Sequence, residues 1–210
     1  MNKFITIKDN IQAEIVEKKS RFIASLFYIE SVEQANIIIK EVKKKYFDAR
    51  HNCIAYRVMD NEMLVEKSSD DGEPSGTAGA PMLNILQKNG LVNVLVIVTR
   101  YFGGVLLGTG GLVRAYSASL QSAIEKSNII QKCPGEELEI LLDYNNFENF
   151  KYYCKNNEIN IIDTKYTENI VCRIEIEELK KQKLLNDFET KKIILKNIRY
   201  ISKKLITKSI

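Results

Sequence analysis

The chain has 210 residues, which at about 150 residues per domain indicates one large domain or two small ones. Its hydrophobic fraction of 45% and charged fraction of 28% are typical of a globular protein and exclude disorder, collagen and a coiled coil as the main architecture. The net charge of +4 is too small to indicate a nucleic-acid-binding protein by itself.

The first part of the chain predicts a mixed domain of strands and helices. The segments at 4–7 and 11–29 alternate or run apolar and are rich in β-branched and aromatic residues, which predicts two or three antiparallel strands. Ser31 is a candidate N-cap for a helix that extends to Lys45. Two short strands, 52–59 and 63–68, follow and are joined at Asp60-Asn61.

Nine of the ten glycines lie between Gly72 and Gly111, and eight of them belong to two loops. A helix over 78–87 is predicted to follow the first loop. Pro81 does not argue against it, because proline is tolerated in the first turn of a helix. The almost wholly apolar segment 91–102 predicts a buried central strand. The second loop then leads into a helix over about 110–126.

The Pro-Gly pair in Cys133-Pro134-Gly135 predicts a turn and a domain boundary. We expect an N-terminal domain over 1–132 and a C-terminal domain over 136–210. The second part predicts a strand at 137–144, a helix at 145–156, two strands within 162–176, a helix at 177–189 and a strand at 193–201. This β-α-β-β-α-β order is that of a ferredoxin-like domain, so the expected fold class is α+β with two domains.

Every charged residue after Glu189 is basic, which makes the C-terminal segment either a binding surface for phosphates or a solvated lysine-rich end. These residues are Lys191, Lys192, Lys196, Arg199, Lys203, Lys204 and Lys208.

Neither a metal nor a cofactor is expected. The four cysteines form no CxxC pair and only His51 could join them, so a structural zinc site or a disulfide framework is disfavoured. Because no apolar run reaches about 18 residues and the N-terminal segment lacks a signal-peptide pattern, we expect a cytoplasmic protein with no membrane association.

The first glycine loop is acidic. Its carboxylates, Asp70, Asp71 and Glu73, have the chemistry to hold Mg²⁺, but they equally favour the positive end of the helix that follows. Ser75 and Thr77 are candidate caps of that helix.

The second glycine loop is the best candidate for an anion site, because it leaves a buried strand and enters a helix whose first N–H groups have no helical partner. Arg100 and Arg114 flank it, and their planar guanidinium groups suit phosphate. We expect both arginines to be exposed to anions. The expected site consists of Arg100, Gly103, Gly104, Gly108, Thr109, Gly110, Gly111 and Arg114.

Two known phosphate-binding motifs do not fit this loop. Thr109 follows Gly108 where a Walker A loop requires lysine, and Val113 stands where the dinucleotide fingerprint requires glycine. Val105, Leu106 and Leu107 add apolar bulk that is unusual in a phosphate loop and could pack beneath it.

Other candidates are weaker. His51 and Cys53 are two residues apart on a strand and therefore share a face, although no oxyanion donor accompanies them. Arg21 is a further cation in a strand region. Aromatic residues near the second loop either stack on bases or fill the core.

Four segments together resemble the YigZ/IMPACT family: EKKSRFIA at 17–24, HNCIAYRV at 51–58, DDGEPSGTAGAPML at 70–83 and VTRYFGGVLLGTGGLVRAY at 98–116. The resemblance implies an N-terminal domain similar to ribosomal protein S5 domain 2, a two-layer α/β fold. It also implies a ferredoxin-like C-terminal domain similar to domains of elongation factor G. Relatives of both domains bind RNA or act on the ribosome, and eukaryotic IMPACT proteins are linked to control of translation.

The leading hypothesis is therefore a non-enzymatic protein that binds RNA or the ribosome and regulates translation. One alternative is a Mg²⁺-dependent enzyme that acts on a small phosphorylated compound, with the acidic loop holding the metal. Another is a protein-interaction module whose loops bind a protein partner.

Overall fold

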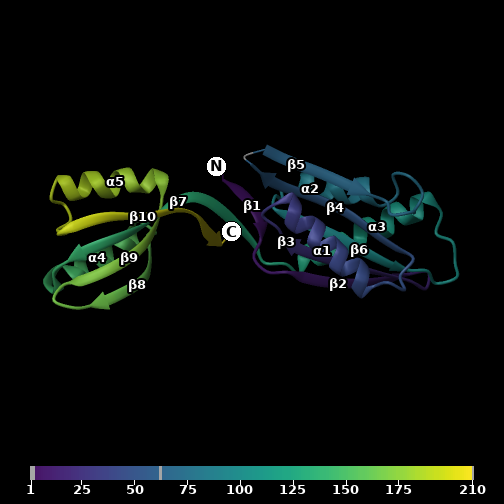
Figure 1. Cartoon of the computed structure of the whole chain (residues 1–210), viewed down its shortest axis with the longest axis horizontal. Coiled ribbons are helices and arrows are strands. Elements are labelled where there is room, and N and C mark those ends of the chain that lie inside the picture. The colour runs from purple at the N-terminus through teal and green to yellow at the C-terminus, as the bar shows by residue number, and fades with distance from the viewer. Residues whose placement is uncertain (1–2, 62, 210) are drawn as a thin grey trace. The chain divides into compact units, whose positions relative to one another are not determined.

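The computed structural model describes residues 3–61 and 63–209, which divide into two compact units. One unit consists mainly of Phe4–Gln131 and the other of Lys132–Lys208. The expectation of an α+β protein with two domains is confirmed (Figure 1).

The N-terminal unit contains a five-stranded sheet in the order β2-β3-β6-β4-β5. Its strands are β2 (Ile11–Glu17), β3 (Ser20–Tyr28), β4 (His51–Asp60), β5 (Met63–Ser69) and β6 (Val94–Tyr101). Every neighbouring pair is antiparallel. As its apolar sequence predicts, β6 is the central strand, and it is buried from Val94 to Arg100.

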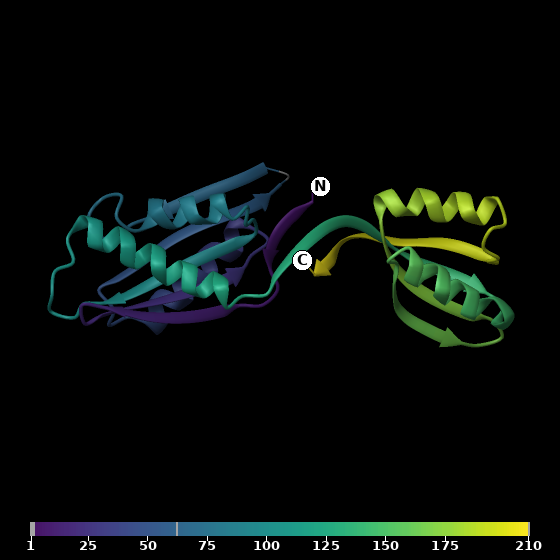
Figure 2. The same ribbon diagram turned by 180° about the vertical axis from the view of Figure 1, so that it is seen from behind.

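Helices cover both faces of this sheet. The helix α1 (Val32–Lys45) lies on one face, in front of the sheet in Figure 1, and buries Ala35 and Val42 against β4 and β6. The helices α2 (Gly79–Lys88) and α3 (Thr109–Glu125) lie on the other face, and α3 is in front in Figure 2. Alternate residues of the buried strands therefore enter two different hydrophobic clusters.

The sheet register brings three distant segments together at one end of β6. Arg100 lies opposite Phe22 of β3 on one side and opposite His51 of β4 on the other. The two glycine loops begin near this end, because the second loop follows Tyr101 directly and the first loop follows β5, which pairs with β4.

The C-terminal unit has the predicted β-α-β-β-α-β order. Its elements are β7 (Ile129–Leu142), α4 (Tyr144–Asn156), β8 (Asn160–Tyr166), β9 (Ile170–Glu177), α5 (Glu178–Glu189) and β10 (Asn197–Ser209). The strand order is β10-β7-β9-β8, so the first and third strands of the motif lie side by side in the centre, as in a ferredoxin-like sheet. β7 also pairs with the short β1 (Phe4–Ile7).

The turn predicted at Cys133-Pro134-Gly135 is wrong, because all three residues lie inside the long strand β7. Gly135 is needed there for close packing. A Cβ atom at Gly135 would come within 2.1 Å of Ile206 Cδ1 and 2.6 Å of the Ile176 carbonyl oxygen.

Most of the basic C-terminal residues have acidic partners. Lys196 lies 2.6 Å from Asp143, Arg199 lies 2.7 Å from Glu139, and Lys208 lies 2.5 Å from Glu177. These ion pairs neutralise much of the charge that the sequence concentrates after Glu189.

Among the residues that the structure describes, no helix is both long enough and apolar enough to cross a membrane.

Candidate functional site

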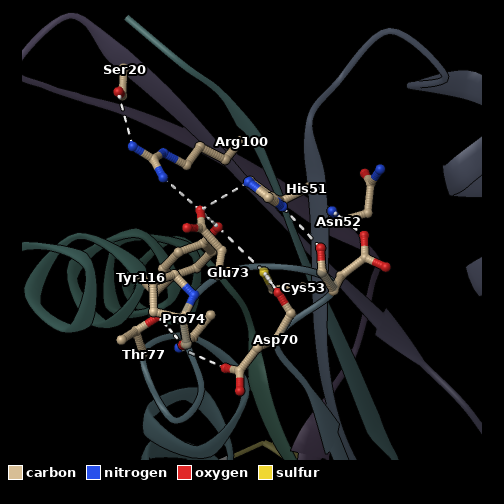
Figure 3. A network of polar contacts seen from close by, with 12 residues as sticks. Ser20, His51, Asn52, Cys53, Asp70, Glu73, Pro74, Thr77, Arg100 and Tyr116 are labelled. Carbon is tan, nitrogen blue, oxygen red and sulfur yellow. Dashed lines mark hydrogen bonds and ion pairs between the residues drawn. The ribbon is translucent and has the colours of Figure 1, made fainter. Parts of the chain in front are cut away.

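A polar network joins the first glycine loop to the end of β6 (Figure 3). Glu73 is at its centre. One oxygen of the Glu73 carboxylate, Oε1, accepts hydrogen bonds from Arg100 Nη1 at 2.6 Å and from the Tyr116 hydroxyl at 2.8 Å. Both side chains of the Glu73–Arg100 ion pair are almost completely buried, with 3% and 7% of their surfaces exposed.

The Arg100 guanidinium is enclosed on its other sides as well. Its central carbon lies 5.3 Å from the centre of the Phe22 ring and 5.6 Å from that of Phe102. Nη2 lies 3.5 Å from Ser20 Oγ. The expectation that Arg100 offers an exposed guanidinium to anions is therefore wrong, because the guanidinium is buried and already paired with Glu73.

Tyr116 connects the network to the core of the N-terminal unit. The α3 helix carries Tyr116 beneath the sheet, where its ring packs edge-on against Phe22. Its hydroxyl oxygen also lies 3.3 Å from Cys53 Sγ. Burial raises the pKa of Tyr116 well above its usual value and raises the pKa of Cys53 to about 12, so both groups are neutral and unreactive near pH 7.

His51 and Cys53 face the same side of β4, as strand alternation predicts, and both contact the first loop. His51 Nδ1 lies 2.9 Å from the Asp71 carbonyl oxygen, which can only accept, so Nδ1 carries the proton. Cys53 Sγ donates to the Asp70 carbonyl oxygen at 2.9 Å. A thiol held in this way is a structural group and not an activated nucleophile.

Asp70 caps helix α2 from a distance. Its carboxylate accepts hydrogen bonds from the N–H groups of Gly76, Ala78 and Gly79 at 2.8–2.9 Å. Partial burial opposes ionisation, but these three donors hold the pKa of Asp70 below its usual value.

The predicted capping by Ser75 and Thr77 is therefore wrong, because Asp70 takes that role. No side chain of the residue at the N-cap itself, Ala78, makes a capping bond. Thr77 Oγ1 instead donates to the Pro74 carbonyl oxygen at 2.6 Å, and Ser75 is exposed.

The three carboxylates of the acidic loop face different partners. Asp70 binds backbone N–H groups, Asp71 pairs with Lys43 at 2.6 Å and accepts from the Asn52 N–H at 2.7 Å, and Glu73 pairs with Arg100. They do not converge on a common point, and within the described part of the chain no group of three or more His, Cys, Asp or Glu residues is placed to hold a metal ion.

The second glycine loop packs against the hairpin that joins β2 and β3. A Cβ atom at Gly103 would lie 2.0 Å from the Lys19 carbonyl carbon, and the Gly103 N–H donates to Ser20 Oγ at 3.1 Å. Glycine is therefore required at this position. Lys18 and Lys19 at the tip of the hairpin are exposed.

Beyond Gly103 the loop is exposed, and it ends at the start of helix α3. Leu107 packs against the core as the sequence suggests, whereas Val105 and Leu106 are 40% and 82% exposed. Gly104, Gly108, Thr109 and Gly110 are also exposed.

The N-cap of helix α3 is Gly108, which has no side chain to form a capping bond, and no side chain of the described residues bonds to the first N–H groups of this helix. The N–H groups of its first turn have no partner within the helix. Arg114 is exposed, and its Nη1 lies 3.6 Å from the position that a Cβ atom would take on Gly110. We call the first-turn amides and Arg114 the amide–arginine site. It retains one of the two arginines that the sequence analysis selected.

Other cations near the second loop differ in whether they have an acidic partner. Arg21 donates two hydrogen bonds to Glu14, at 2.9 and 3.0 Å, so it is already paired. Arg50 is exposed and lies with its guanidinium 6.0 Å from the Phe102 ring centre. Within residues 3–61 and 63–209, Arg50 and Arg114 have no carboxylate partner.

Arg50 is not among the site residues expected from the sequence, although it directly precedes His51. Its place follows from the register, which residue types do not reveal: His51 pairs with Arg100, so the preceding residue lies beside the start of the second loop.

The protein is therefore a two-domain α+β protein of a known type. Its first unit has two glycine loops and a buried polar network at the end of β6, and its second unit is ferredoxin-like. The Impact N-terminal domain matches residues 18–124, and a domain of unknown function, DUF1949, matches residues 140–200. The chain belongs to the IMPACT family.

Relatives cover most of the chain. "IMPACT family member YvyE" of Bacillus subtilis is 35% identical over 178 residues, which are 85% of this chain and 82% of that protein. "IMPACT family member YigZ" of Escherichia coli is 36% identical over 160 residues, which are 75% of this chain and 78% of that protein. A solved structure described as that of a hypothetical protein has a TM-score of 0.62 and 30% identity, and covers 96% of this chain and 98% of its own.

Proposed function

We propose that the protein is a non-enzymatic RNA- or ribosome-binding protein that regulates translation in the cytoplasm. The observation that carries this proposal is the exposed amide–arginine site, where Arg114 lies beside the uncapped first turn of α3. Such helix starts attract phosphate through N–H donors and the helix dipole, and an adjacent arginine adds a full charge. Membership of the IMPACT family supports a role in translation, as its eukaryotic members suggest.

The site differs from the one expected from the sequence because Arg100 does not contribute. Its buried ion pair with Glu73 instead fixes the strand end from which the second loop departs. The exposed cations that remain near the loop are Arg114, Arg50, Lys18 and Lys19. Binding through phosphate contacts of this kind weakens as salt is added.

The test is ribosome binding by wild type and two charge-matched variants. Arg114→Ala removes the proposed contact, whereas Lys126→Ala removes an exposed charge from the other end of the same helix. We expect Arg114→Ala to weaken co-sedimentation with ribosomes and to reduce the slope of log K against log salt by about one, with Lys126→Ala unchanged. Equal behaviour of the two variants would reject the site.

A protein partner is the second candidate, and the 82% exposure of Leu106 on the second loop is the observation that favours it. In that case one protein co-purifies in the presence of nuclease and high salt, and Leu106→Ser abolishes the association. Val16→Ser removes a side chain that is 62% exposed on β2 and serves as the control.

A further inference from the structure

A groove crosses the helical side of the C-terminal unit. It lies between helix α4 and the segment Lys191–Leu195 that connects α5 to β10, and its volume is about 360 Å³. This size is within the range of small-molecule sites, about 300–1,000 Å³. Two neighbouring hollows share its lining residues, one through Tyr153 and Asn156 and one through Lys191 and Ile194, so the groove continues in both directions.

Carboxamides and one exposed aromatic ring dominate the α4 wall. The side chains of Asn146, Asn149 and Asn156 line the groove, and none has a partner within the described part of the chain. A carboxamide offers both donors and an acceptor, which is the pattern needed to pair with the edge of a base. The Tyr152 ring is 68% exposed beside them.

The opposite wall is basic. Lys191 and Lys192 line the groove, and no carboxylate of the described residues lines its main volume. Lys192 lies 3.3 Å from Asp187, whose other oxygen accepts from the Tyr153 hydroxyl at 2.9 Å. The Asp187 carboxylate is thus paired with Lys192 and also accepts a hydrogen bond from Tyr153. Lys191 is exposed and has no carboxylate within ion-pair distance in residues 3–61 and 63–209.

We propose that this groove binds unpaired nucleotides of single-stranded RNA. Tyr152 stacks on a base, the carboxamides of Asn146, Asn149 and Asn156 contact base edges, and Lys191 contacts a phosphate. Unpaired bases suit the groove better than a duplex, whose base edges and faces are covered by pairing and stacking. The inference extends the proposed RNA-binding function to a second site on the other unit, and it rests on separate residues.

The first test measures fluorescence anisotropy of a fluorescein-labelled 12-nucleotide oligo(U) RNA with the full-length protein. Tyr152→Ala is expected to raise the Kd about tenfold, the loss typical of one stacked base. The control Tyr200→Ala removes a 52% exposed tyrosine from β10 and should leave the Kd within twofold of wild type. Because Tyr152 is largely exposed, its removal should not disturb folding, which circular dichroism and Tm verify.

Two further variant pairs test the basic and carboxamide walls. Lys191→Ala should reduce the salt slope by about 0.7, the value for one phosphate contact on a single strand, whereas Lys203→Ala on β10 should not. Asn149→Asp places a negative charge in the groove and should weaken oligo(U) binding. Asn145→Asp makes the same change on α4 outside the groove lining and should not.

Several results would overturn the groove proposal. They are failure of the wild type to bind oligo(U) at low salt, equal effects of Tyr152→Ala and Tyr200→Ala, and equally good competition by a 12-base-pair RNA duplex. Displacement of oligo(U) by polyglutamate at equal charge would assign the groove to acidic proteins instead. If Arg114→Ala impairs ribosome binding while Tyr152→Ala leaves oligo(U) binding intact, the groove proposal fails and the proposed function stands. The reverse result retains the groove and removes the amide–arginine site.

Discussion

Arg100 and Arg114 flank the same loop but occupy opposite environments. Arg100 is 6% exposed and paired with Glu73, whereas Arg114 is exposed at the start of α3. From the sequence, both arginines are equally good candidates for an anion site. Nothing in the residue types indicates which of them pairs with a carboxylate 27 positions away. In the sequence Glu73 lies beside Asp70 and Asp71, yet of these three carboxylates it is Glu73 that pairs with a residue of β6.

This difference predicts opposite effects on stability. Arg100→Ala leaves the Glu73 carboxylate buried without its cation, so we expect the free energy of unfolding to fall by about 3–5 kcal/mol. Arg114→Ala should change it by no more than about 0.5 kcal/mol. Urea unfolding measures both. The double variant Arg100→Met/Glu73→Gln should recover part of the loss, and a loss as large as in Arg100→Ala would contradict the assigned pairing.

The hydrogen bonds to Asp70 predict a pH dependence. The pKa of Asp70 is lowered in the folded protein, so its carboxylate contributes stability above the unfolded value of about 3.9, and this contribution is lost as pH falls through the folded pKa. The stability difference between wild type and Asp70→Asn should therefore be largest near pH 7 and shrink as the pH falls below about 4. Urea unfolding at a series of pH values measures this difference.

Asp9→Asn, at an exposed position, is the control for the pH series. A difference between wild type and Asp70→Asn that stays constant down to pH 3 would mean that the Asp70 charge does not stabilise the loop.

Two glycines of the second loop region, Gly103 and Gly110, should respond differently to substitution by alanine. Gly103→Ala places a methyl group against the Lys19 backbone, which cannot move without displacing the β2–β3 hairpin, so we expect a loss of about 1–3 kcal/mol. Gly110→Ala meets only the Arg114 side chain at an ordinary contact distance. Its effect should be neutral or stabilising by up to about 1 kcal/mol, because alanine favours helices.

Thermal and urea unfolding of the two alanine variants distinguish these cases. Equal destabilisation would show that the loop does not pack on the hairpin as described.

Most strands and helices could be predicted from periodicity and capping. Ser31 caps α1 as expected, with its side chain accepting from the Gln34 N–H, and the apolar segment before Arg100 is the central strand. The two wrong predictions, the turn at Pro134-Gly135 and the caps of α2, share a physical cause: contacts with residues farther along the chain override local preferences. The turn propensity of Pro134-Gly135 is overridden by packing against Ile206, and Asp70 caps α2 from eight residues before Ala78, beyond any local capping rule.

For the molecule as a whole, each unit has its own hydrophobic core. We therefore expect Leu120→Ala, which empties a buried position of α3, to destabilise the N-terminal unit by about 2–5 kcal/mol. Amide hydrogen exchange followed by mass spectrometry should show faster exchange in β2–β6 and unchanged exchange in β8 and β9. Ile174→Ala in β9 should give the opposite pattern.

Loss of protection throughout the chain in either variant would show that the units unfold together.

The ferredoxin-like order was predictable because each of its helices follows a clear change in the period of its apolar residues. The partners of the late lysines were not, since they depend on which acidic side chains of the neighbouring strands come within reach.

All four cysteines of the chain, Cys53, Cys133, Cys154 and Cys172, are buried and none forms a disulfide. Burial raises the pKa of both Cys53 and Cys154 to about 12, which leaves almost no thiolate at neutral pH. The folded protein should therefore react with Ellman's reagent only after denaturation. A single cysteine engineered on the surface would take up a maleimide dye selectively, so fluorescent reporters can be attached to either unit without first replacing the native thiols.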